Sequence, residues 1–309
     1  MATIRPDLQA AEFKRPPFLT DIILPPLMKE QIAGTLYYQK VLADNDAQSG
    51  RAHAETIGTI TEHIVAASTK TFSCEEVRDR QKMSYTQVKG YADLLHAELA
   101  MARRAKRAWF NKIETATAKA LLGAASPLDL TGSTADIPGD IENAVAELQD
   151  KAPGKIALVL SSRNFTKLKA NDSIKDRMKN TGVVVGAGGD PRMVTAEQLA
   201  AILGVDQLLI GPNDVWFAAM KKNPTASGGS DGFDYQGNAA LVVLPDEATE
   251  PAEEIQLGRT IYYKWSSDGD FYVCESYHED KVDADCVDVK GLVDSQILNA
   301  DLCKTVKLF

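Results

Sequence analysis

A serine flanked by glycines has the clearest spacing for chemistry in this 309-residue chain. The string Gly-Gly-Ser-Asp-Gly at 228–232 has the spacing of a nucleophile elbow, in which a serine stands on a sharp turn between a strand and a helix. Residues 221–238 are rich in glycine, serine and asparagine, and no helix is predicted after Ser230. The pattern favours a loop, and a soluble hydrolase that uses Ser230 is kept as an alternative of a different class.

Other strings lack a residue that their chemistry requires. Residues 186–191 are similar to a dinucleotide loop, but Pro191 occupies the position of the third glycine. Residues 44–55 have the ligand spacing of a calcium loop, but its glycine is displaced to Gly50. The four histidines are not spaced as two ligands on one helix face, and the four cysteines include no Cys-x-x-Cys pair. We therefore predict no enzyme, no catalytic residue, no metal and no cofactor, and we expect reduced, mostly buried thiols.

One stretch concentrates positive charge, on a predicted long helix. Residues 85–122 contain no proline, and apolar groups recur there at spacings of three and four, so we predict one amphipathic helix that begins after Ser84 and ends at Gly123. Its apolar stripe includes Leu95, Leu99 and Trp109. The basic residues lie opposite that stripe, on a face that is either solvated or directed at nucleic acid or an acidic neighbouring subunit. They are Arg103, Arg104, Lys106 and Arg107.

Beyond the long helix the pattern alternates between helices and strands. We predict helices at 141–151, 164–179 and 195–203, and strands at 156–161, 182–185, 207–211 and 239–244. Thr195 is expected to be an N-cap that is paired with Gln198, and Gly204 is expected to end that helix. From residue 258 onward, short alternating runs predict an antiparallel meander. The fold class predicted is α+β, with an α/β module inside it.

The first 83 residues contain apolar groups that need a neighbour. Residues 1–35 combine five prolines with isolated apolar groups, which argues against helix and indicates an extended arm that docks on another surface. Residues 36–83 predict a long projecting hairpin whose second strand includes 56–64. The candidate subunit-interface residues in these segments are Phe18, Ile22, Tyr37, Tyr38, Ile57, Ile60 and Ile64.

Composition indicates a folded chain and limits its partners. Hydrophobic residues are 44% and charged residues 25%, close to ordinary globular usage. The net charge of -9 argues against a surface built mainly to neutralise phosphates, so the further alternative of a DNA-binding module would require the helix face at Arg103 and Lys106 to dominate. No run of residues has the length and apolar character of a membrane span or a signal peptide, and we expect a cytoplasmic chain without a membrane partner.

The order of these parts resembles the major capsid protein of tailed bacteriophages, the Hong Kong 97 fold. Several local sequence segments are also similar to those of this family. They are Leu-Val-Leu-Ser-Ser-Arg-Asn-Phe-Thr-Lys-Leu at 158–168, residues 194–211, and the C-terminal segments 275–280, 287–290 and 302–306. The resemblance implies an N-terminal arm (1–35), an extended β-hairpin loop (36–83), a spine helix with part of a peripheral domain (84–136), an axial domain (137–250) and the C-terminal strands of the peripheral domain (251–309).

What the resemblance implies is self-assembly. Copies would form the hexamers and pentamers of an icosahedral shell that encloses double-stranded DNA, located in the virion and in the host cytoplasm during assembly. The partners implied are further copies of the chain, weakly bound DNA, and separate scaffold, portal and decoration proteins. Some members join a lysine to an asparagine of a neighbour; Lys70 and Asn299 are residues of these types, but no local string indicates that they meet. An encapsulin-type shell around protein cargo is the nearest alternative.

Overall fold

The computed structural model describes residues 3–9, 18–40, 67–91, 94–124, 127–130, 136–152, 154–180, 194–211, 239–245, 251, 254–265 and 271–308. Helices and strands are mixed along the chain, which confirms the α+β class. The chain divides into two compact units: Met1–Gly34 with Thr71–Thr117 and Arg259–Gln296, and Thr35–Lys70 with Ala118–Gly258 and Ile297–Phe309. Among the described helices, none has the length and apolar character needed to cross a membrane.

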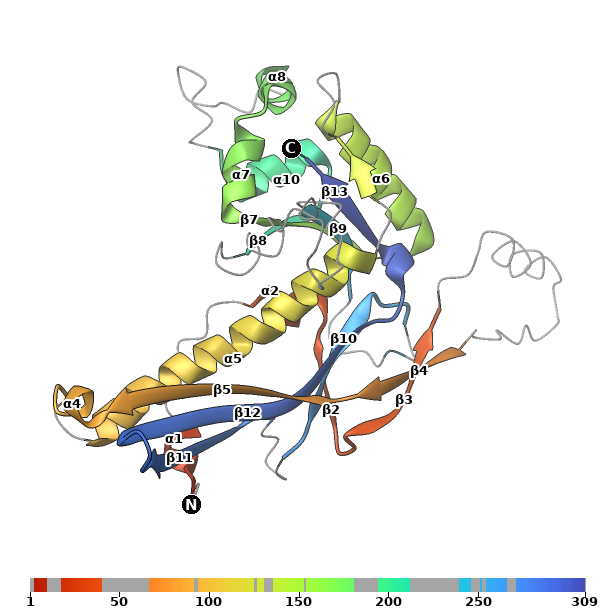
Figure 1. Ribbon diagram of the computed structural model, residues 1–309. Coiled ribbons are helices and arrows are strands. Elements are labelled where there is room, and N and C mark those ends of the chain that lie inside the picture. The colour runs from red at the N-terminus through yellow and green to blue at the C-terminus, as the bar shows by residue number, and fades with distance from the viewer. Residues whose placement is uncertain are drawn as a thin grey trace, which may run out of the picture. The chain divides into compact units, whose positions relative to one another are not determined.

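A six-stranded sheet forms the frame of the first unit (Figure 1). Its order is β1 (Thr3–Ile4), β11 (Val273–Glu279), β12 (Ala284–Ile297), β10 (Gly258–Tyr263) and β2 (Pro26–Lys29), and β5 (Glu75–Ser84) also pairs with β12. Because β11 and β5 both pair with β12 over Ala284–Lys290, they lie along its opposite edges. The predicted meander is therefore wrong in its order, since β12 and not β11 is central and the last strand joins the other sheet.

The long helix packs along one face of this sheet. The predicted helix divides into α4 (Tyr85–Val88) and the 31-residue α5 (Leu94–Ala124), because the chain turns at Gly90, whose amide donates to the Gln87 carbonyl at 3.0 Å. The predicted cap is present in part, since the Ser84 amide donates to Gln87 Oε1 at 3.0 Å. In Figure 1, α5 runs beside β5 and β12, and its fully buried Trp109 lies in one core cluster with residues of β12.

The N-terminal segment docks on its own unit, and it contains helical turns. Pro6 starts α1 (Pro6–Gln9), where a missing amide hydrogen costs nothing, and α2 (Leu19–Ile23) follows. Leu8, Ile23 and Leu24 are fully buried. The expectation of an extended segment without helix is therefore wrong for these two short stretches.

The second unit contains a five-stranded sheet with four described helices. The sheet order is β6 (Pro127–Asp129), β13 (Cys303–Lys307), β9 (Ala239–Leu244), β7 (Lys155–Ser161) and β8 (Gln207–Gly211). All six residues of β9 are buried, as expected for a strand covered on both faces. The helices are α6 (Ile137–Lys151), α7 (Ser162–Lys169), α8 (Asp172–Asn180) and α10 (Ala196–Leu203), and η3 (Ala300–Leu302) is a short 3₁₀ turn. The expected α/β alternation is therefore present.

Two helix ends in this unit show how local chemistry sets the bounds. The helix predicted at 164–179 is divided, because Asn171 Oδ1 accepts from the Ser173 amide at 3.0 Å and starts a new helix. The predicted capping box of Thr195 and Gln198 is present, and Gly204 ends α10 with a φ of 67°.

Within the predicted hairpin region at 36–83, β3 (Ala33–Gln39) pairs with β4 (Ala67–Ser73), so the pairing partner of β3 follows the predicted second strand in sequence. The predicted strands at 56–64 and 182–185 lie outside the described residues.

Candidate assembly surfaces

The described residues contain no group of three or more histidine, cysteine or acidic side chains that could hold a metal ion. Ser230 and the strings at 186–191 and 44–55 lie outside the part of the chain that the structure describes. The four cysteines are free and buried, as expected.

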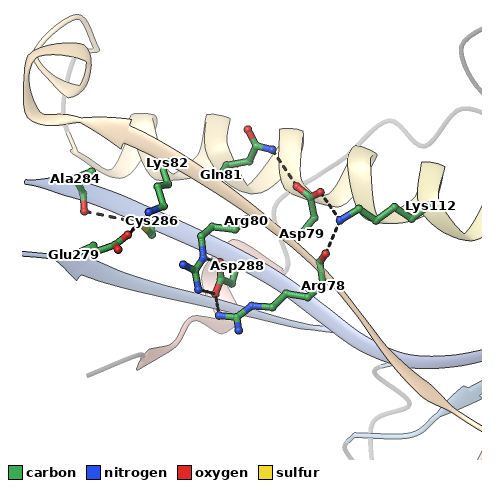
Figure 2. Close-up of polar contacts among 10 residues, drawn as sticks. All are labelled: Arg78, Asp79, Arg80, Gln81, Lys82, Lys112, Glu279, Ala284, Cys286 and Asp288. Atoms are coloured by element: carbon green, nitrogen blue, oxygen red, sulfur yellow. Dashed lines mark hydrogen bonds and ion pairs between the residues drawn. The ribbon is translucent and has the colours of Figure 1, made fainter. Parts of the chain in front are cut away.

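The face of the six-stranded sheet opposite α5 carries a set of cross-strand ion pairs, which we call the charge ladder (Figure 2). Side chains alternate along β5, so Arg78, Arg80 and Lys82 are exposed, whereas the intervening Asp79 accepts from Lys112 of α5 at 2.9 Å. The ladder residues are Arg78, Arg80 and Lys82 of β5, Asp288 and Lys290 of β12, and Glu275 and Glu279 of β11.

Asp288 is the centre of the ladder. Its side chain is fully buried, and it accepts from Arg80 Nε at 2.9 Å and from the guanidinium of Arg78. These hydrogen bonds raise the pKa of both arginines above the ordinary value. Arg80 also lies 5.3 Å from the ring centre of Tyr277. Both guanidiniums are thus held in place at the surface by one buried carboxylate.

The rest of the ladder is largely neutralised. Lys290 pairs with Glu275 at 2.6 Å, and Lys82 pairs with Glu279. Because each cation has a carboxylate beside it, this face is unsuited to tight binding of a polyanion. It is a polar, preorganised surface. The alternation of charged residues at 75–82 is the sequence signal that could have located it.

The structure corrects the basic face predicted on the long helix. Arg103, Arg104 and Arg107 are exposed, but Lys106 is only 1% exposed and its ammonium lies 5.5 Å from the ring centre of Tyr272. Burial lowers the pKa of Lys106. The reason is helical spacing, since Lys106 lies four residues after Ala102 and three before Trp109, within the buried stripe.

The candidate interface residues differ in exposure. Phe18 is buried and stacks on Phe110 of the same chain, with ring centres 4.9 Å apart, so it is not available to a neighbour. Ile22 is 37% exposed and Tyr37 59%, while Tyr38 is half-buried. Ile57, Ile60 and Ile64 lie outside the described residues.

The structure also exposes apolar side chains that were not among the predicted interface residues. Leu95 was expected in the buried stripe of the long helix but is 46% exposed, because it lies in the first turn of α5. Within the described ranges, and besides Ile22 and Tyr37, the exposed large apolar residues also include Ile4, Met28, Ile32, Leu94, Trp265 and Val282.

Lys70 and Asn299 both make contacts within their own unit. Lys70 Nζ donates to the carbonyl of Ile297 at 2.6 Å. The amide of Asn299 donates to the carbonyls of Gln39 at 2.9 Å and Gln256 at 2.8 Å, and Asn299 is 4% exposed. Asn299 is therefore buried and hydrogen-bonded to two other segments of its own chain.

A cavity of about 330 Å³ lies in the first unit beside α5. Its lining mixes apolar side chains such as Val77 and Ile113 with charged ones such as Glu75 and Asp294. Lys112, which also lines it, is engaged by Asp79 and by the Arg78 carbonyl.

The comparisons with known proteins connect this fold to viral shells. No family model matches the chain, and no curated protein does. Among solved structures, a phage-related protein from Bordetella bronchiseptica is 14% identical, with 100% of this chain and 98% of that chain covered at a TM-score of 0.64. A virus-like particle from Pyrococcus furiosus is 10% identical, with 98% and 95% covered at 0.55. The mature capsid of bacteriophage PhiM1 is 10% identical, with 96% and 88% covered at 0.54. At these identities the likeness establishes a shared fold over nearly the whole chain.

Proposed function

The chain has the Hong Kong 97 capsid fold, and on that premise we propose that it is the major capsid protein of a tailed bacteriophage. The observation that supports the proposal most strongly is the match of the whole chain to a phage-related protein, with 98% of that protein covered as well. In this proposal the chain has a structural role and not a catalytic one. Its parts would be the arm at 1–35, the extended loop at 36–83, the spine helix and part of the peripheral domain at 84–136, the axial domain at 137–250 and the closing strands at 251–309.

Exposed apolar side chains supply surfaces for assembly. Among the predicted interface residues that the structure describes, Ile22 and Tyr37 are exposed, and Val282 adds an apolar side chain that is 55% exposed in the turn between β11 and β12. A neighbouring copy that covers these side chains would remove apolar surface from water, which favours association. We infer contacts among copies in pentamers and hexamers of a shell.

Double-stranded DNA would be the content of the shell. The net charge of -9 keeps the chain from adhering to a confined polyanion. Three basic residues are exposed on α5 and would form a weak, salt-sensitive contact with this DNA: Arg103, Arg104 and Arg107. Lys106 is buried and would not take part. A shell around protein cargo is the second candidate, supported by the likeness to the Pyrococcus furiosus virus-like particle.

The test is to express the full chain, alone and with proteins encoded beside it, and to measure particles by light scattering and negative-stain microscopy. Closed shells, or rings of five and six copies, are the expected result. Nuclease treatment of native particles then separates the two contents, because protected DNA supports a phage head and protein cargo without DNA supports the alternative. A monodisperse monomer at high concentration would contradict both.

A further inference from the structure

Two helices of the second unit carry opposite charge. α7 has three cations and no carboxylate, so its net charge is +3. α6 has four carboxylates and one cation, so its net charge is -3. The cations of α7 are Arg163, Lys167 and Lys169, and the charged residues of α6 are Asp140, Glu142, Glu147, Asp150 and Lys151. Charge is therefore segregated by helix within one compact unit.

The positive charge of α7 lies on its solvent side. Arg163 and Lys167, which we call the basic pair, share one face because they are four residues apart, and both are exposed. The adjoining face holds the helix on its unit, since Leu168 is fully buried and Asn164 is 2% exposed. The Asn164 amide also donates to Ser161 Oγ at 3.2 Å, which caps the helix. The basic pair is thus presented on a helix whose position is fixed.

The negative charge of α6 is presented in the same way. Glu147 and Asp150, which we call the acidic pair, are three residues apart on one face of α6, and both are exposed. Ile141 and Leu148 are fully buried and hold the helix on its unit. Glu147 pairs with Lys304 of β13, and its side chain is still 62% exposed. The acidic pair therefore remains accessible to a second molecule.

The two charged helices occupy different places in the unit. In Figure 1, α7 and α6 lie on opposite sides of α10. α6 packs against α10 and α8, whereas α7 packs against β7, β8 and α8. The basic pair and the acidic pair therefore belong to two separate surfaces of one copy.

Symmetry decides how two copies could use these surfaces. A two-fold contact joins the same surface of both copies, so α7 against α7 would bring cations together and α6 against α6 would bring carboxylates together. A contact between α7 of one copy and α6 of the next brings opposite charges together. Because such a contact joins two different surfaces, its repetition continues from copy to copy and gives a ring wherever the rotation closes.

We propose that the basic pair of one copy faces the acidic pair of the next, and that this contact selects which surfaces of the second unit meet in rings of five and six copies. The inference rests on the proposed function and deepens it by naming the surfaces through which a second copy binds. Its role is selection of the contact and of its direction, since exposed charge pairs contribute more to specificity than to affinity.

The test reverses the charge of each pair in the full chain. The variant Arg163→Glu, Lys167→Glu makes the basic pair negative, and the variant Glu147→Lys, Asp150→Lys makes the acidic pair positive. Each variant alone would then place like charges at every contact. We expect the yield of rings and particles, counted by negative-stain microscopy and light scattering, to fall at least about tenfold for either variant.

Recovery of assembly is the decisive part of the test. Mixed in equal amounts, the two variants place opposite charges at every contact of a ring in which they alternate. We therefore expect rings of six to return and rings of five, which cannot alternate, to stay rare. A chain with all four substitutions should recover both kinds of ring. Lys155→Glu, at an exposed position outside both helices, is the control and should leave the yield unchanged.

The outcomes separate this contact from the capsid proposal. If wild type assembles and both double variants assemble equally well, the contact is overturned and the proposed function stands. Loss of assembly without recovery on mixing, in variants whose circular dichroism and melting match wild type, also overturns the contact, and so does an equal loss in the control. If a double variant unfolds, Lys167→Glu and Asp150→Lys are mixed in the same way. If wild type forms neither rings nor particles, the proposed function and the contact both fail.

Discussion

Glu114 and Thr20 are joined by two hydrogen bonds, from the Thr20 amide at 3.2 Å and from its hydroxyl at 2.8 Å, and both residues are buried. The substitution Glu114→Gln replaces one acceptor oxygen by an NH₂ group that faces donors. Because hydrogen bonds to a charged group contribute about 1.5–3 kcal/mol each, we expect the free energy of unfolding to fall by about 2 kcal/mol. Urea denaturation measures it. Thr20→Val removes only the hydroxyl and should cost about 1 kcal/mol; equal stability of Glu114→Gln and wild type would contradict this account.

Asp288 gives the second prediction. The substitution Asp288→Asn leaves Arg78 and Arg80 without their shared carboxylate, at a site that is 0% exposed. Removing one partner of a buried pair costs about 3–5 kcal/mol, and because both guanidiniums reach solvent we expect about 2 kcal/mol here. Glu279→Gln is the matched control, since its pair with Lys82 is more exposed and its loss should change stability much less than Asp288→Asn does. Equal effects of the two substitutions would argue against a special role of Asp288.

Lys106 gives a prediction about alkaline pH. Burial lowers its pKa in the folded protein, so between that lowered value and the ordinary value near 10.5 the unfolded chain binds more protons than the folded one. Stability from this group therefore rises with pH across that window. In thermal denaturation, the melting temperature of wild type should rise relative to that of Lys106→Met as pH increases toward 10. The melting temperature of Arg103→Met, at an exposed position, should change with pH as that of wild type does. Parallel curves for wild type and Lys106→Met would contradict the buried placement.

His278 gives a prediction about neutral pH. Its ring Nδ1 donates to the Asp285 carboxylate at 2.9 Å, and this hydrogen bond, together with the nearby Asp280 and Asp283, raises its pKa above the ordinary value of 6.5. The stabilisation is fully present below the unfolded value and is lost as pH rises through the raised folded value. Titration followed by NMR should show the raised pKa, and Asp285→Asn should lower it. An unchanged midpoint in that variant would show that the contact does not form in solution.

The sequence predicts the elements that depend on local chemistry. The bounds of β8 and β9 and the capping box of α10 agree with the prediction, because a short apolar run or an N-cap with its partner is specified within a few residues. The break at Gly90 and the cap at Asn171 were missed, although each is a local signal inside a longer periodic pattern.

Long-range pairings could not be predicted in the same way. The place of β12 between β11 and β10 depends on residues that are far apart in sequence, and so does the transfer of β13 to the second sheet. Lys106 was assigned to the exposed face by its charge, whereas its spacing from Trp109 places it in the core. For the candidate surfaces, the sequence marked Ile22 and Tyr37 but not the charge ladder, whose members come from three strands.

Self-assembly is the central claim, and the native mass of the purified full chain tests it most directly. One chain has a mass of 33.5 kDa. The account predicts species at five and six times that mass, together with closed particles that contain many copies of both. A single species at the mass of one chain, at high protein concentration and with every candidate assembly partner added, would contradict it.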